Sequence, residues 1–297
     1  MQSPVLPSNA LTRRQMLVRS AGAVAALATL SSLSPLWAAP ARRRFKVGAC
    51  DWSLGKLGDP GAFDLAKEIG LDGVQVSLGT VADDLKLRRP DVQRECREAA
   101  RRTGVAIASL AIGELNQVPF KSDPRTIEWV SDSIDVCRAL GVRVVLLAFF
   151  GKGDLRDDPA GVEEVVRRLK RLAPKAEKAG VVLGLESWLS GEAHLDILRR
   201  VGSRAVQVYY DCCNSNERGY DIYSEIRVLG RKRICEFHFK ENGALLGQGR
   251  VDYRKVRAAL DAIGYGGWVQ IEGALPPGAD LLESYRANCR FVREVLG

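Results

Sequence analysis

Histidine, paired cysteines and long apolar runs are all scarce in this sequence of 297 residues. Only two histidines are present, and no CxxC pair offers the thiolates of a structural zinc site. The seven cysteines are an odd number and lack the close spacing of a disulfide scaffold, so most of them are expected to be small core residues. These absences exclude a small disulfide-stapled module and a thiolate-bound zinc domain.

Acidic residues and lysine are absent from residues 1–41. This segment carries the pair Arg13-Arg14, and the apolar stretch that follows is too short and too rich in Ala and Ser for a convincing membrane span. Residues 12–17 (TRRQML) resemble a twin-arginine signal, with a cleavage site near residues 39–41. We therefore expect a twin-arginine signal peptide over 1–41 and a periplasmic or otherwise exported protein with no stable membrane span after cleavage. An uncleaved anchor is the alternative.

Without this segment the chain is only mildly basic. Three arginines leave with it and no acidic residue does, which leaves 41 basic against 36 acidic residues, a formal net charge of +5. The basic residues of 94–102 and 167–178 alternate with Glu, as on a solvated helix face. No basic stripe with interleaved aromatic residues is present, so nucleic acid is not an expected partner.

Eight short apolar runs recur from residue 45 onward, and their first residues are 25 to 39 positions apart. The runs are Phe45–Cys50, Gly73–Leu78, Val105–Leu110, Val142–Ala148, Val181–Glu186, Val206–Tyr210, Ile234–Phe239 and Trp268–Glu272. Stretches of helical period lie between them, among them Asp91–Thr103, Arg125–Leu140, Ala160–Ala179, Tyr253–Ile263 and Ala279–Leu296. Glycine stands between helix and strand at positions 70, 104, 141, 180 and 264. Eight such units in about 255 residues predict an α/β fold, a single (β/α)₈ TIM barrel over residues 42–297.

Four consecutive strands of this barrel close on, or near, a side chain that can bind a metal. These side chains are Glu186, Asp211, His238 and Glu272. Barrel chemistry collects at the carboxyl ends of the strands, and three carboxylates buried together there need a cation. The mostly oxygen-donor set suits one divalent ion, Mn²⁺, Mg²⁺ or Co²⁺, with zinc as an alternative. The competing interpretation is four unrelated helix caps or ion pairs at the barrel rim.

With these residues in place, the chain resembles the xylose isomerase-like TIM barrel superfamily of sugar isomerases and epimerases. The motifs that carry the resemblance are residues 185–187 (LES), 210–211 (YD), 238–241 (HFKE), 246–252 (LGQGRVD) and 264–268 (GYGGW). The resemblance implies that the four residues above bind the metal and that Glu186 and Glu272 are catalytic, moving a substrate proton. The two-histidine total separates the chain from the endonuclease IV group, whose zinc cluster needs several histidines.

The implied chemistry is proton transfer through an enediolate of a sugar or keto-sugar. Glu192, Asn214 and Lys240 are the candidate substrate-binding residues. A surface charge in the first turn of a helix is the alternative for Glu192, and an ion pair with Glu241 is the alternative for Lys240. Asn214 departs from the ketose 3-epimerases, which usually have a histidine at this place, and it cannot change charge as histidine can.

Three functions therefore follow from the sequence. The leading one is a metal-dependent isomerase or epimerase of a sugar or keto-sugar. The second is a lyase or dehydratase that eliminates water from a keto-sugar or inosose at the same metal site. The third is a non-catalytic periplasmic carbohydrate-binding barrel. In all three the partner is a small carbohydrate, and an oligomer is compatible with the sequence.

Overall fold

A ring of eight parallel strands forms the centre of the computed structural model, which describes residues 44–297. The signal peptide predicted over 1–41 lies outside the described residues. The strands are β1 (Phe45–Cys50), β2 (Gly73–Ser77), β3 (Ala106–Ile112), β4 (Val144–Phe149), β5 (Val182–Ser187), β6 (Val206–Asp211), β7 (Ile234–Glu241) and β8 (Gly267–Gly273). All eight predicted strands are confirmed.

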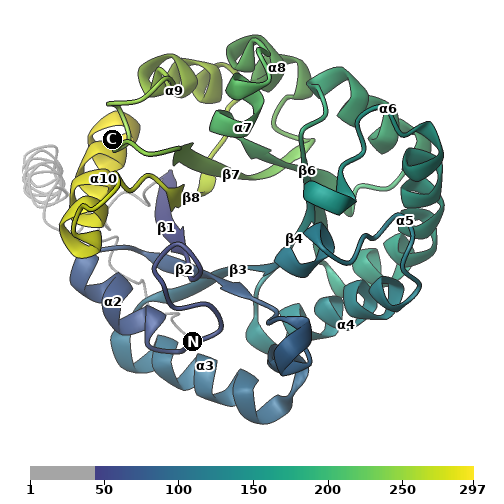
Figure 1. Cartoon of the computed structure of the whole chain (residues 1–297), viewed down its shortest axis with the longest axis horizontal. Coiled ribbons are helices and arrows are strands. Elements are labelled where there is room, and N and C mark those ends of the chain that lie inside the picture. Colours follow the sequence, from purple (N-terminus) through teal and green to yellow (C-terminus); the bar gives the residue numbers. More distant parts are fainter. Residues whose placement is uncertain (1–43) are drawn as a thin grey trace, which may run out of the picture. The chain divides into compact units, whose positions relative to one another are not determined.

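The ring closes because β1 pairs with both β2 and β8. Most strand residues are buried and most are apolar, as expected where a core fills the ring and helices cover it outside. Figure 1 views the barrel with the strands at the centre and the helices around them. The predicted single (β/α)₈ barrel is therefore confirmed.

The helices of the outer layer connect successive strands, and the last of them, α10, follows β8. They are α2 (Ala62–Ile69), α3 (Pro90–Thr103), α4 (Arg125–Leu140), α5 (Pro159–Ala179), α6 (Gly191–Val201), α7 (Cys212–Glu217), α8 (Ile222–Leu229), α9 (Tyr253–Ala262) and α10 (Leu281–Leu296). Short 3₁₀ turns, η2 (Val81–Asp83), η3 (Lys86–Arg88), η4 (Gly113–Asn116) and η5 (Gly151–Gly153), lie in the loops after β2, β3 and β4. Within residues 44–297, no helix is long and apolar enough to cross a membrane.

The glycines predicted to separate helix from strand do so by their backbone conformation. Gly104 and Gly180 end α3 and α5 with φ of 76° and 67°, the left-handed region in which a side chain would be strained. Between consecutive strands the helices carry the chain back to the same end of the barrel, so every strand runs in the same direction. The carboxyl ends of all eight strands therefore meet at one face of the barrel.

Candidate metal centre

The four predicted ligands reach one point from four neighbouring strands. They are Glu186 on β5, Asp211 at the end of β6, His238 on β7 and Glu272 on β8. One donor atom from each lies within 4.8 Å of the others. In the ring, Asp211 is the register partner of His238. Four separate caps or ion pairs would not converge in this way.

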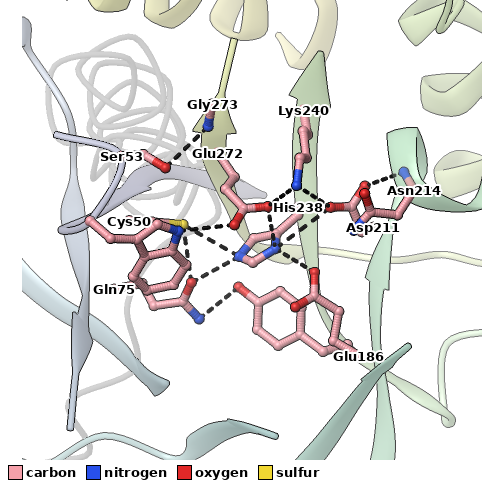
Figure 2. A network of polar contacts seen from close by, with 12 residues as sticks. Cys50, Ser53, Gln75, Glu186, Asp211, Asn214, His238, Lys240, Glu272 and Gly273 are labelled. Carbon is pink, nitrogen blue, oxygen red and sulfur yellow. Dashed lines mark hydrogen bonds and ion pairs between the residues drawn. The ribbon is translucent and has the colours of Figure 1, made fainter. Parts of the chain in front are cut away.

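His238 lies at the middle of the cluster and is fully buried. Its Nδ1 is 2.8 Å from Glu186 Oε1, 3.4 Å from Glu272 Oε2 and 3.9 Å from Asp211 Oδ2. Figure 2 shows the three carboxylates gathered on this edge of the ring. The face of His238 that carries Nδ1 is therefore surrounded by oxygen donors.

Two of these oxygens have no hydrogen-bond partner. Asp211 Oδ2 and Glu272 Oε2 are buried within the described chain without a donor aligned on them. An unsatisfied buried carboxylate oxygen is costly unless a cation neutralises it. The donor set of three carboxylates and one imidazole fits a divalent ion of the Mn²⁺, Mg²⁺ or Co²⁺ type, and zinc remains chemically compatible.

Lys240 brings an ammonium group to the same place. Its Nζ lies 3.1 Å from Glu272 Oε2 and 3.9 Å from Asp211 Oδ2. Burial acts to lower the pKa of Lys240, but the carboxylates of Glu272 and Asp211 outweigh it and raise the pKa. Lys240 points into the site, so the alternative of a rim ion pair with Glu241 is wrong.

The pKa values of two candidate ligands, Asp211 and Glu272, are shifted in opposite directions. Burial raises the pKa of Asp211 above its ordinary value. Burial also acts to raise the pKa of Glu272, but His238, Lys240 and a hydrogen bond from Trp52 together lower it. For His238, burial opposes the charged form, yet the surrounding carboxylates of Glu186 and Glu272 raise the pKa well above 6.5. Without a cation to balance the carboxylates, the cluster therefore favours the protonated imidazole of His238.

A cavity of about 490 Å³ opens directly over this cluster. Its walls include Trp52, Phe150 and Trp188, and its floor includes Glu186, Asn214, Lys240 and Glu272. Trp52 Nε1 donates a hydrogen bond of 2.9 Å to Glu272 Oε1, so this indole orients a candidate ligand as well as forming a wall.

The three predicted substrate-binding residues do not all lie together. Asn214 is buried at the cavity, and its backbone N–H donates to Asp211 Oδ1 at 2.8 Å. Lys240 also lines the cavity. Glu192 is exposed in the first turn of α6 and does not line the cavity, which agrees with the alternative of a surface helix charge.

His194, the other histidine, is buried rather than exposed. Its Nδ1 is 3.0 Å from the carbonyl oxygen of Ser190, and its Nε2 is 2.9 Å from Ser187 Oγ. Ser187 follows Glu186 directly, so His194 supports the loop that leaves the metal cluster. Burial lowers the pKa of His194 to about 4.

Sequence reasoning missed the residues behind His238. Cys50 Sγ lies 3.4 Å from His238 Nε2, and Gln75 Oε1 lies 2.8 Å from the same nitrogen. The available signal was Gln75 itself, an amide in the middle of an apolar strand. Strand alternation can predict that such a residue lies inside the barrel, but it does not predict which side chain the residue contacts.

Comparison with known proteins agrees with this architecture. Residues 63–295 match the family described as xylose isomerase-like TIM barrel. The chain belongs to this family. A curated relative, 2-epi-5-epi-valiolone 7-phosphate 2-epimerase from Actinoplanes sp., is 26% identical over 225 residues, covering 72% of this chain and 82% of the relative.

Solved structures show the same fold. D-psicose 3-epimerase from Clostridium cellulolyticum H10, determined with D-tagatose, has a TM-score of 0.73 and 21% identity, covering 84% of this chain and 99% of its own. The 3-keto-D-glucoside 4-epimerase of E. coli has a TM-score of 0.69 and 17% identity, covering 84% and 99%. At these identities the structures establish the fold of a xylose isomerase-like barrel.

Proposed function

We propose that this xylose isomerase-like barrel is a divalent-metal-dependent epimerase or isomerase of a sugar or keto-sugar. The observation that carries the proposal is the convergence of Glu186, Asp211, His238 and Glu272, with donor atoms within 4.8 Å of one another, at the floor of the cavity. The relatives named above support it, because each is an epimerase of a sugar or a cyclic polyol by its name.

The four ligands would hold the ion, which when bound supplies a Lewis acid that polarises a substrate carbonyl. Glu186 and Glu272 then carry the proton chemistry. They come from β5 and β8, which β6 and β7 separate in the ring, so their carboxylates enter the cavity from different directions. One carboxylate can remove a proton from a carbon beside the carbonyl, and the other can return it to the opposite face of the enediolate.

Neighbouring side chains hold these two carboxylates and the sugar in place. Trp52 orients Glu272 through its indole N–H. The rings of Phe150 and Trp188 pack edge to face, with centroids 5.1 Å apart, and give the cavity an apolar wall for a sugar ring. Lys240 offers an ammonium donor for a hydroxyl group, and Asn214 lines the same floor.

A second candidate, a dehydratase, is favoured by the presence of both Asn214 and Lys240 in the lining of the cavity. The amide of Asn214 cannot accept or release a proton near neutral pH. Lys240 keeps its proton because of the carboxylates around it. An ammonium group at this position could assist the departure of a hydroxyl from the enediolate, which turns proton exchange into elimination of water.

Solvent exchange with the metal-loaded protein tests these alternatives. The protein is incubated in D₂O with ketoses, 3-keto-glucosides and inososes, and the sugars are recovered and analysed by NMR and mass spectrometry. Deuterium in an epimerised or isomerised product supports the leading proposal, and a dehydrated product supports the dehydratase. Binding of a sugar without exchange or elimination would leave a carbohydrate-binding barrel and overturn both.

We also propose that the protein is exported through its predicted twin-arginine signal at residues 1–41. The support is the Arg13-Arg14 pair and the absence of acidic residues from this segment. Changing both arginines to lysine in the full-length chain should leave the protein in the cytoplasm, as fractionation would show. Unchanged export of that variant would contradict the proposal.

A further inference from the structure

A second group of polar side chains lies inside the barrel, one layer closer to the amino ends of the strands than the metal cluster. Its members are Gln75 on β2, Ser109 on β3, Tyr209 on β6, Glu236 on β7 and Gln270 on β8. None is more than 2% exposed. Glu236 stands two residues before His238, so strand alternation places both on the inner face of β7.

One oxygen of Glu236 accepts three hydrogen bonds from side chains of this layer. Ser109 Oγ donates to Glu236 Oε2 at 2.8 Å, Tyr209 OH donates at 3.1 Å, and Gln270 Nε2 donates at 3.3 Å. A hydroxyl group has a single proton to donate. The hydroxyl protons of Ser109 and Tyr209 therefore both point to Glu236 Oε2, whether or not Glu236 Oε1 carries a proton.

The direction of these two hydrogen bonds determines which end of the Gln75 amide faces the hydroxyl groups. Gln75 Nε2 lies 3.1 Å from both Ser109 Oγ and Tyr209 OH. These hydroxyl oxygens can only accept, so the amide must present its NH₂ group to them. The opposite orientation would place the amide oxygen against two oxygens that have no proton left, which is unfavourable in a buried site.

The oxygen of Gln75 consequently faces His238. It lies 2.8 Å from His238 Nε2 and 3.2 Å from Cys50 Sγ, as Figure 2 shows. An amide oxygen only accepts hydrogen bonds, so His238 Nε2 must carry a proton. In the neutral imidazole the other nitrogen, Nδ1, is then free of a proton. Nδ1 is the atom that faces the three carboxylates of the metal cluster.

We propose that Glu236 and Gln75 are positioning residues that fix the tautomer of His238, so that Nδ1 is available to a divalent ion. Glu236 accepts the protons of the two hydroxyl groups, which makes both hydroxyl oxygens acceptors for the NH₂ group of Gln75. The oxygen of Gln75 then accepts the proton of His238 Nε2. Neither residue belongs to the four candidate ligands or lines the cavity. The inference rests on the proposed metal-dependent function, because only a bound ion requires Nδ1 without a proton.

The two-histidine sequence makes the tautomer directly measurable. Protein labelled with ¹⁵N and loaded with Mg²⁺ or Zn²⁺ shows two imidazole spin systems, and the His194→Gln variant assigns them. In the wild type, His238 should be protonated at Nε2. In Glu236→Gln the new amide can donate to the hydroxyls, so Gln75 is free to turn over, and the Nε2 proton signal should be lost.

Metal affinity gives a second measurement. The dissociation constant of the ion should rise about 10- to 100-fold in both Glu236→Gln and Gln75→Leu, as is typical when a group that orients a metal-binding histidine is removed. Gln93→Leu is the matched control, since Gln93 is also a buried amide but donates to the backbone oxygens of Leu87 and Arg88, away from the cluster. It should leave both the tautomer and the affinity unchanged.

The outcomes separate the inference from the function on which it rests. A wild type that binds no divalent ion overturns both. An ion bound to a His238 that is protonated at Nδ1 overturns the inference alone, as do Gln75→Leu and Glu236→Gln proteins with wild-type tautomer and affinity. Near-ultraviolet circular dichroism establishes that each variant is folded, and Gln75→Leu carries the test if Glu236→Gln does not fold.

Discussion

Glu272 shows how single residues set the charge of this site. Its carboxylate is held by the indole of Trp52 at 2.9 Å and faces the ammonium of Lys240 at 3.1 Å. These partners and His238 outweigh the cost of burial and keep its pKa below the ordinary value. Glu272 is thus ionised at neutral pH, the state in which a carboxylate can bind a metal.

Replacement of either glutamate to which we assign the proton transfer should lower turnover sharply but leave the fold. Glu186→Gln and Glu272→Gln keep the size of the side chain and remove its basicity, and we expect kcat to fall about 10²- to 10⁴-fold at saturating metal. Glu95→Gln, on the exposed face of α3, is the matched control. Full turnover in both site variants, measured by deuterium incorporation, would show that the acid–base assignment is wrong.

Metal binding should depend on pH because the ion competes with a proton. The pKa of His238 in the metal-free protein is raised well above 6.5, so the imidazole is protonated at pH 7, whereas a ligand must be neutral. Each proton displaced makes the affinity rise about tenfold per pH unit. Isothermal titration with Mn²⁺ at pH 6, 7 and 8 measures this. A dissociation constant that does not change with pH would contradict it.

At the scale of elements, the strands were predictable because their pattern is strong. A buried parallel strand is a continuous apolar run, and β1 begins and ends at the predicted residues. Helix α7 was not among the predicted helices, since its six residues, Cys212–Glu217, are too few to show a period. It begins where Asp211 accepts a hydrogen bond from Asn214 N. The metal cluster followed from residues at strand ends, whereas the pairing of Gln75 with His238 depends on the ring closing.

The free energy of unfolding should depend on pH through His194, which lies at the junction between β5 and α6. In the folded protein the pKa of His194 is about 4, whereas in the unfolded chain it is about 6.5. The unfolded chain therefore binds more protons between these values, and the contribution of His194 to stability is complete above pH 6.5 and declines as the pH falls toward 4. Over that range wild type should lose up to about 3 kcal/mol more than His194→Gln.

Urea unfolding at several pH values measures this difference. His194→Gln retains a group that can bond to both Ser187 and Ser190, so the comparison isolates the titration of the imidazole. Other buried acids titrate equally in both proteins and cancel. Parallel curves of unfolding free energy against pH for the two proteins would rule out His194 as the cause.

At the scale of the whole molecule, the seven cysteines are unpaired and at most partly exposed. This confirms the expectation that most of them are core residues. Burial raises the pKa of Cys50 and of Cys213 to about 12, so these groups are thiols rather than reactive thiolates at neutral pH. A barrel of this kind can keep free cysteines even in an oxidising compartment.

The melting temperature should therefore be independent of reductant. We expect the same Tm with and without dithiothreitol, and a thiol count of seven after denaturation in the absence of reductant. Differential scanning fluorimetry and a colorimetric thiol assay provide the two measurements. A lower Tm in dithiothreitol, or fewer than seven thiols, would reveal a disulfide.

The hydrogen bond between Trp52 and Glu272 joins residues that are 220 positions apart in the sequence. The last strand must dock against the first before this contact can form, so the ribosome has to finish nearly the whole chain before the site exists. A nascent chain cannot hold the metal in this geometry. If the protein binds a metal and is exported in the folded state, as we propose, then the ion is acquired in the cytoplasm, and the metal supply of that compartment selects which ion is carried outside.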